Sequence, residues 1–222
     1  ALFNNKIVQL LINHPNIDVN IKSFEKVHNI NGTNTIEECH PFIEAINVFN
    51  IEIIKILLSS DQFNINTVFR KYDNNSNSND DYISIVEETS VMFYAIKHGY
   101  IEIVKLLLSY PKIDVNIKSK IKNDDVDNDD GDVINETFLC FAIRKNKTEI
   151  VKLLLENPRI DVNDVSTYEF RDDNSIDEKT ALFLAFEKEN IEIIELLLKI
   201  QSINVNCKLV SYKKPEDPSY IN

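Results

Sequence analysis

One pattern of apolar and polar positions recurs along the chain and predicts a helix at each occurrence. In Ile101–Leu108, written IEIVKLLL, only Glu102 and Lys105 are polar. A helix over these residues would be apolar on most of its circumference and would keep one narrow solvated stripe, on which the two charged residues can pair. Pro111 follows and cannot continue a helix, so the pattern also predicts a sharp stop.

The segment belongs to a repeat. Similar apolar helices are each followed by a short ending such as IDVN, and the last residues of these endings are Asn20, Asn66, Asn116, Asn163 and Asn206. The spacings between them are 46, 50, 47 and 43 residues. Alternation within the ending predicts a short extended segment, and its Asp and Asn side chains are suited to bond the backbone of the turn that follows. Self-similarity at this period predicts stacked repeats.

A shorter helix is predicted before each complete apolar one. Its four versions, HPFIEAI, SVMFYAI, TFLCFAI and TALFLAF, place an alanine five residues after the first position, where a small side chain lets two helices approach closely. Ser90, Thr137 and Thr180 are suited to cap these helices, and Pro41 suits a first turn. Between the two helices a left-handed residue is expected at Gly99 and, less easily, at three asparagines, Asn50, Asn146 and Asn190.

This order of helix, turn, apolar helix and extended segment resembles the ankyrin repeat. The resemblance rests on T-x-L-x-x-A at Thr137–Ala142 and Thr180–Ala185, and on G-x-x-E-I-V-K-L-L-L at Gly99–Leu108. It covers essentially the whole chain. The histidine that the family places in its T-P-L-H motif is replaced by Ile43, Phe93, Cys140 and Phe183, so apolar packing is expected there.

The resemblance implies an all-α class, an ankyrin-repeat solenoid of helix-turn-helix pairs with β-hairpin or loop fingers. We expect one array over residues 1–222, with a partial repeat at 1–20, repeats at about 21–66, 67–116, 117–163 and 164–206, and a finger or tail at 207–222. The period exceeds the family's usual length of about 33 residues. The surplus falls between one ending and the next first helix, which predicts enlarged polar fingers with short β-strands.

The fingers supply the candidate binding residues, because tyrosine and arginine are enriched at binding hot spots. These candidates are Phe69, Arg70, Tyr72, Tyr82, Tyr168, Phe170 and Arg171. Packing of one finger on another is an equally weighted interpretation of the aromatic residues. Insertions on one side of every repeat usually enlarge a binding face.

Charge and composition restrict the class of partner that the chain is expected to bind. A formal net charge of -12 argues against nucleic acid and against an anionic membrane surface, and favours a protein partner with a basic or neutral surface. Three widely spaced cysteines give no disulfide framework, and neither a signal peptide nor a bilayer-length apolar run is present. A cytoplasmic location is the simplest expectation. Because neither terminus shows a polar capping repeat, we also expect a monomeric fragment of a longer chain.

Candidate chemistry is sparse, and we expect no cofactor and no enzyme activity. Within Asp125–Glu136 a calcium loop would use Asp125, Asp127, Asp129 and Glu136, but Gly131 lies one position too late and no helix precedes the segment. A solvated acidic finger is therefore preferred to a metal site. The favoured function is a non-catalytic scaffold that binds a protein through a concave face of first helices and extended acidic fingers. The alternatives are a structural spacer in a larger protein and a calcium-modulated binding module.

Overall fold

The computed structural model of the chain describes residues 2–28, 34–73, 84–122, 133–170, 174–206 and 209–213. The chain divides into two compact units, residues 1–114 and residues 115–222. Each unit is built from the helix pairs and fingers that the repeat predicts, and each is described by itself. No helix in the described ranges is long and apolar enough to cross a bilayer.

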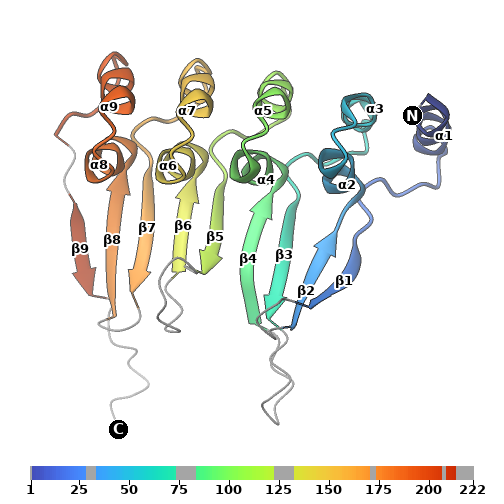
Figure 1. Ribbon diagram of the computed structural model, residues 1–222, viewed down its shortest axis with the longest axis horizontal. Helices are drawn as coiled ribbons and strands as arrows, with labels where there is room; N and C mark the ends of the chain where they lie inside the picture. Colours follow the sequence, from blue (N-terminus) through green and yellow to red (C-terminus); the bar gives the residue numbers. More distant parts are fainter. Residues whose placement is uncertain are drawn as a thin grey trace, which may run out of the picture. The chain divides into compact units, whose positions relative to one another are not determined.

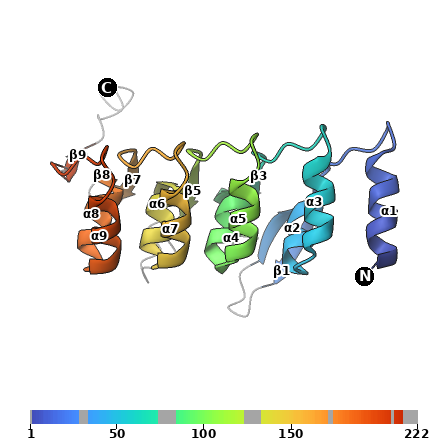
Figure 2. The same cartoon turned by 90° about the horizontal axis from the view of Figure 1, so that it is seen from above.

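The helices come in pairs, a first helix followed by a second one, as Figures 1 and 2 show. In the first unit the second helices are α1 (Leu2–Ile12), α3 (Ile51–Ser59) and α5 (Ile101–Leu108), and the first helices are α2 (Pro41–Asn47) and α4 (Val91–His98). In the second unit the pairs are α6 (Phe138–Arg144) with α7 (Thr148–Leu155), and α8 (Ala181–Glu187) with α9 (Ile191–Leu198). The predicted stripe pairs form on three second helices, as Glu52–Lys55, Glu102–Lys105 and Glu149–Lys152.

The core lies where the first helices pack. The alanine that recurs in these helices is buried in all four copies, and the isoleucine that follows it in three of them, Ile46, Ile96 and Ile143, is buried as well. Phe93 and Cys140, which replace the family's histidine, are also buried, and this agrees with the expected apolar packing. Close packing of this kind leaves little room for a larger side chain at the alanine positions.

The helix caps agree with the sequence only in part. Thr137 and Thr180 cap α6 and α8 through their hydroxyls, but Ser90 makes no side-chain cap bond, so that prediction is wrong. At α2 the cap is His40, whose Nδ1 accepts the Phe42 N–H at 3.1 Å.

The turns between paired helices also need a correction. Gly99 and Asn146 have the expected positive φ. Asn50 and Asn190 do not, because their side chains cap α3 and α9 instead. Phe49 and Glu189, one residue earlier, carry the positive φ in those two copies.

An all-α class is incomplete, because the fingers are regular antiparallel hairpins. In the first unit they are β1 (Ser23–His28) with β2 (Asn34–Cys39), and β3 (Val68–Asp73) with β4 (Ser84–Ser90). The second unit has β5 (Lys118–Lys122) with β6 (Val133–Thr137), β7 (Val165–Phe170) with β8 (Ser175–Thr180), and then β9 (Val210–Lys213). Strand propensity in segments such as TVFRKY predicted the strands, and the helical periodicity elsewhere outweighed them in the choice of class.

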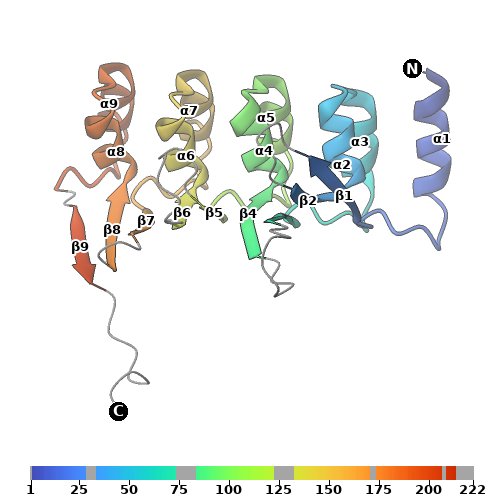
Figure 3. The same ribbon diagram turned by 60° about the horizontal axis from the view of Figure 1, so that its bottom comes forward.

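Neighbouring fingers also pair with one another. β2 pairs with β3 in the first unit, and in the second unit β6 pairs with β7 and β8 pairs with β9. Figure 3 shows β8 and β9 side by side near α8. Each unit therefore combines a helical layer with a sheet that extends from the first helices.

The repeated ending is a turn stabilised by its polar side chains, and it is not the extended segment that its alternation predicted. In four copies the amide N–H of the last Asn bonds the side chain two residues earlier, as in Asn20 with Asp18 at 2.9 Å. The same Asn then binds the following repeat. Asn163 donates from Nδ2 to the Ser202 carbonyl at 2.8 Å and accepts the Asn204 N–H at 2.8 Å.

This two-bond clamp occurs four times within the units. Asn20 clamps Gln62 and Asn64, Asn66 clamps Lys112 and Asp114, Asn116 clamps Arg159 and Asp161, and Asn163 clamps Ser202 and Asn204. The recurrence of the asparagine is thus a requirement of the backbone at the junction between successive repeats.

Candidate functional site

The first unit has a groove where the sheet meets the first helices. In the strand register Glu37 of β2 lies opposite Lys71 of β3, and Lys71 lies opposite Glu87 of β4. Successive residues of a strand point to opposite faces, so these three share one face. Lys97 of α4 pairs with Glu87 at 2.9 Å, which identifies this face as the one toward the first helices.

A cavity of about 290 Å³ opens in this groove. The strands contribute Glu37, Glu38, Phe69, Arg70, Lys71, Glu87 and Thr89 to its lining. The helices contribute Ile43 of α2 and Tyr94, Lys97 and His98 of α4. We call this space the groove cavity. Charged, aromatic and apolar side chains converge in it, an arrangement typical of binding sites.

Tyr94 forms one wall of the groove cavity and is held in place. Its hydroxyl donates to Oδ1 of Asn47 on α2. Its ring lies 4.4 Å from the ring of His98, which lies 5.4 Å from the ring of Tyr100. Burial, followed by the neighbouring Tyr100, Glu44 and Glu37, raises the pKa of Tyr94, so the hydroxyl stays protonated and keeps its bond to Asn47.

The electrostatic environment beside the groove cavity is acidic. Cys39 ends β2 and its thiol lies 3.6 Å from Oε2 of Glu25. Burial raises the pKa of this thiol, and the charges of Glu25, Glu44 and Glu37 raise it further. The thiol is therefore protonated at neutral pH and has no nucleophilic character.

The residues predicted from the third strand lie in different environments. Phe69 is only 3% exposed and packs against His40, with ring centroids 5.1 Å apart. Arg70 donates from Nε to Glu88 at 2.8 Å, across β3 and β4. These contacts favour the finger-packing interpretation for Phe69 and leave part of Arg70 accessible.

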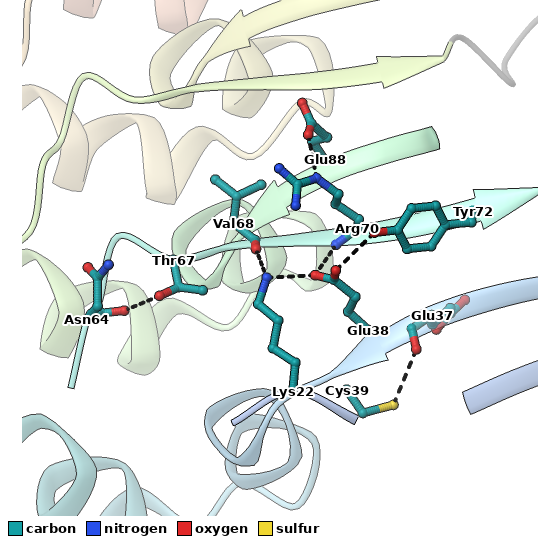
Figure 4. Close-up of polar contacts among 10 residues, drawn as sticks. All are labelled: Lys22, Glu37, Glu38, Cys39, Asn64, Thr67, Val68, Arg70, Tyr72 and Glu88. Carbon is teal, nitrogen blue, oxygen red and sulfur yellow. Dashed lines mark hydrogen bonds and ion pairs between the residues drawn. The ribbon is translucent and has the colours of Figure 1, made fainter. Parts of the chain in front are cut away.

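Tyr72 and Arg70 take part in a network around Glu38, drawn in Figure 4. The Glu38 carboxylate accepts the Lys22 ammonium at 2.7 Å, the Tyr72 hydroxyl at 3.0 Å and the Arg70 backbone N–H at 3.1 Å. Burial alone would raise the pKa of Glu38, but the bonds from Lys22 and Tyr72 hold it below its usual value. Lys22 also donates to the Val68 carbonyl at 2.7 Å, so the network joins neighbouring fingers.

The candidates in the second unit are likewise separated from one another. Tyr168 is 7% exposed, and its hydroxyl donates to Oε1 of Glu136 at 2.7 Å. Burial, with the charge of Glu136 next in importance, raises the pKa of Tyr168. Phe170 ends β7 and is half-buried. Tyr82 and Arg171 lie outside the described residues.

Glu136, the twelfth residue of the alternative calcium loop, has a structural role. It is fully buried in β6, and Arg144 binds it with both ends, Nε to Oε1 at 2.8 Å and Nη2 to Oε2 at 2.9 Å. Its oxygens are thus occupied by Arg144 and Tyr168. Asp125, Asp127 and Asp129 lie outside the described residues. In the ranges that are described, no three His, Cys, Asp or Glu side chains form a metal-binding group.

In the second unit, side chains from successive repeats meet between the sheet and α6. Arg144 has the position in α6 that Lys97 has in α4 and Asn47 has in α2, and Tyr168 comes from the first strand of the following repeat. Arg144 reaches Glu136, and Tyr168 closes over the same carboxylate. Sequence reasoning missed Ile43, Tyr94 and Lys97, although Tyr94, Lys97 and His98 have the i, i+3, i+4 spacing of one helix face.

The comparison with family models agrees with this architecture. The family model described as "Ankyrin repeats (3 copies)" matches residues 1–119 and 117–208. Among solved structures, the ankyrin repeat protein EF0377 is 20% identical with a TM-score of 0.48, and the match covers 76% of this chain. The chain spans only 65% of the length of that protein's chain. No curated protein matches the sequence significantly. Because the family model matches nearly the whole chain, this protein belongs to the ankyrin repeat family.

Proposed function

We propose that the chain is a non-catalytic protein-interaction module that binds a partner segment in the groove of residues 1–114. The observation that carries the proposal is the groove cavity, because it joins exposed side chains of β2, β3 and β4 to those of α2 and α4. Ankyrin repeats generally mediate protein–protein interaction, and they are typically non-enzymatic. A basic or neutral partner surface fits the net charge of -12.

The groove also revises the proposed contact residues. Tyr94, Lys97 and His98 have exposed polar or aromatic surface in the groove, whereas Phe69 and Tyr168 have almost none. Of the predicted finger residues in the first unit, Arg70 and Tyr72 keep partial exposure and stay in the proposal, whereas the half-buried Phe170 belongs to the second unit and lies outside this groove. A cytoplasmic location remains a prediction from the sequence.

A structural spacer is the main alternative function, and the surface features that it requires are different. A spacer needs stable stacking between repeats and no open recognition cavity. The preorganised Tyr94, held by Asn47 and packed against the tilted ring of His98, favours a binding role. The role of Glu136 in the interior removes the residue that a calcium-modulated module would need as its strongest ligand.

Affinity capture with paired variants tests the proposal. The groove variant Tyr94→Ala/Lys97→Ala should capture at least about tenfold less partner from a lysate of the source cells than the wild type, because interface hot spots dominate affinity. The matched control is Tyr110→Ala/Lys105→Ala at the end of α5, which should capture as much as the wild type. Circular dichroism must show that both variants fold. Equal capture by all three proteins, or no captured protein at all, would favour the spacer.

A further inference from the structure

The groove cavity carries a specific charge pattern. Along its sheet face Glu25, Glu37, Lys71 and Glu87 form one cross-strand row in register. Strands lie about 4.8 Å apart, so Glu37 and Glu87 are separated by roughly 10 Å with Lys71 between them. Lys71 pairs with Glu37 at 2.9 Å, and Lys97 pairs with Glu87 at 2.9 Å.

The two lysines leave some acceptor positions of the Glu37 and Glu87 carboxylates unused. Each ionised carboxylate offers about four acceptor positions, so Glu37 and Glu87 keep capacity for a further donor. Glu25 and Glu44 add two more negative charges next to the groove cavity, and both raise the pKa of Cys39. Among the described side chains of this sheet face and of the facing helices, four glutamates therefore outnumber two lysines. Arg70, which also lines the groove cavity, is paired with Glu88.

The remaining walls suit a long side chain with a flat cationic end. Ile43 provides apolar surface for a methylene chain. The rings of Tyr94 and His98 provide aromatic faces on which a guanidinium stacks, and guanidinium forks match carboxylates better than ammonium groups do. A volume of about 290 Å³ accommodates one such side chain.

The second unit shows that this part of the fold accepts an arginine. There Arg144 extends from the first helix to the sheet, binds Glu136 bidentately and lies over the Phe141 ring at 5.4 Å. In the first unit the corresponding residues are Lys97 and Thr89, and the space beside them is open.

We propose that the groove cavity of residues 1–114 receives an arginine side chain from an extended basic segment of a partner protein. The guanidinium stacks on Tyr94 and is shared between Glu37 and Glu87, while its methylene groups lie on Ile43. This inference rests on the proposed function and adds the chemistry of the residue that is recognised. It needs no change in the fold, because both carboxylates are already positioned by lysines.

The test begins with a random dodecapeptide display library selected on the full chain, with counter-selection on Tyr94→Ala. Enriched peptides should contain an arginine flanked by neutral or basic residues. Calorimetry with synthetic copies should show affinity falling at least about tenfold when that arginine becomes glutamine, less when it becomes lysine, and most when it becomes glutamate. Affinity should also fall as the salt concentration rises.

Variants of the protein locate the contact. Glu37→Gln/Glu87→Gln should lose at least about tenfold in affinity, whereas the charge-matched control Glu52→Gln/Glu102→Gln, on the second helices, should keep it. Should the groove variant fail to fold, the peptide substitutions still decide the outcome.

The failure of this inference is distinguishable from that of the proposed function. Enriched peptides that depend on Tyr94 but bind as well with glutamine in place of arginine would overturn the arginine site and leave the groove as a binding surface. A library in which no peptide depends on Tyr94 would overturn both.

Discussion

At the residue scale, the recurrent asparagine explains why the endings repeat so faithfully. Its side chain has one acceptor and two donor positions, and the clamp uses an acceptor and a donor to join the loops of successive repeats. Glutamine has one more methylene group and would shift the amide away from the two backbone groups of the next repeat that it bonds, and aspartate would lose the donor. The sequence indicated a backbone role for this residue, but its partners lie in the next repeat and could not be deduced from local spacing.

The clamp predicts a measurable loss of stability. Asn163→Ala removes two hydrogen bonds and should lower the free energy of unfolding by about 1–2 kcal/mol in urea denaturation of the full chain. Asn206 has the same place in its ending and, among the described residues, makes no such clamp. Asn206→Ala is therefore the control and should change stability by less than about 0.5 kcal/mol. Equal losses in both variants would mean that the turn alone, without the clamp, accounts for the effect.

At the element scale, the sequence predicted the helices better than their ends. The 3.6-residue periodicity of the second helices is strong because one face of the helix packs on its own first helix, as α3 packs on α2 and α7 on α6. Every predicted pair is present. A capping hydrogen bond forms only if the side chain of the capping residue points toward the helix, and contacts with neighbouring elements determine that orientation. Ser90 has the right chemistry and does not cap, whereas His40 caps α2 although histidine is an uncommon choice.

The His40 cap predicts a pH dependence. Burial, followed by the charge of Lys22, lowers the pKa of His40 to about 4, with Asp18 opposing the shift. Its Nδ1 accepts the Phe42 N–H and must be unprotonated to do so. The unfolded chain, with a histidine pKa of about 6.5, therefore takes up a proton before the folded chain does. His40 therefore contributes to the free energy of unfolding above pH 6.5. This contribution is lost as the pH falls toward 4, and the complete loss is on the order of 3 kcal/mol.

The variant His40→Thr isolates this contribution, because threonine caps the equivalent helices α6 and α8. Urea unfolding between pH 7 and pH 4.5 should show a steeper loss for the wild type than for the variant, since carboxylate protonation affects both alike. Parallel losses would show that His40 titrates in the folded chain as it does in the unfolded one.

At the scale of the whole molecule, the family and the repeat order followed from the sequence, whereas the groove did not. Its walls come from Ile43 on α2, Lys71 and Glu87 on the sheet, and Tyr94 on α4, which the register of paired fingers brings together. Sequence reasoning ranked finger residues by type, so it selected Phe69 and Tyr168, whose apolar surface the interior buries. The groove cavity is instead marked by side chains exposed on the first-helix face, and this exposure depends on packing between repeats.

Site-directed photocrosslinking tests the central claim most directly. A benzoylphenylalanine residue placed at position 94 in the groove, and separately at position 105 on α5, should react only with proteins that touch those positions. Tyr94→benzoylphenylalanine in the full chain should yield a crosslinked partner from a lysate of the source cells, and arginine amide at high concentration should reduce the yield. Lys105→benzoylphenylalanine should yield none of that partner. Equal crosslinking at both positions, or at position 105 alone, would contradict recognition through the groove.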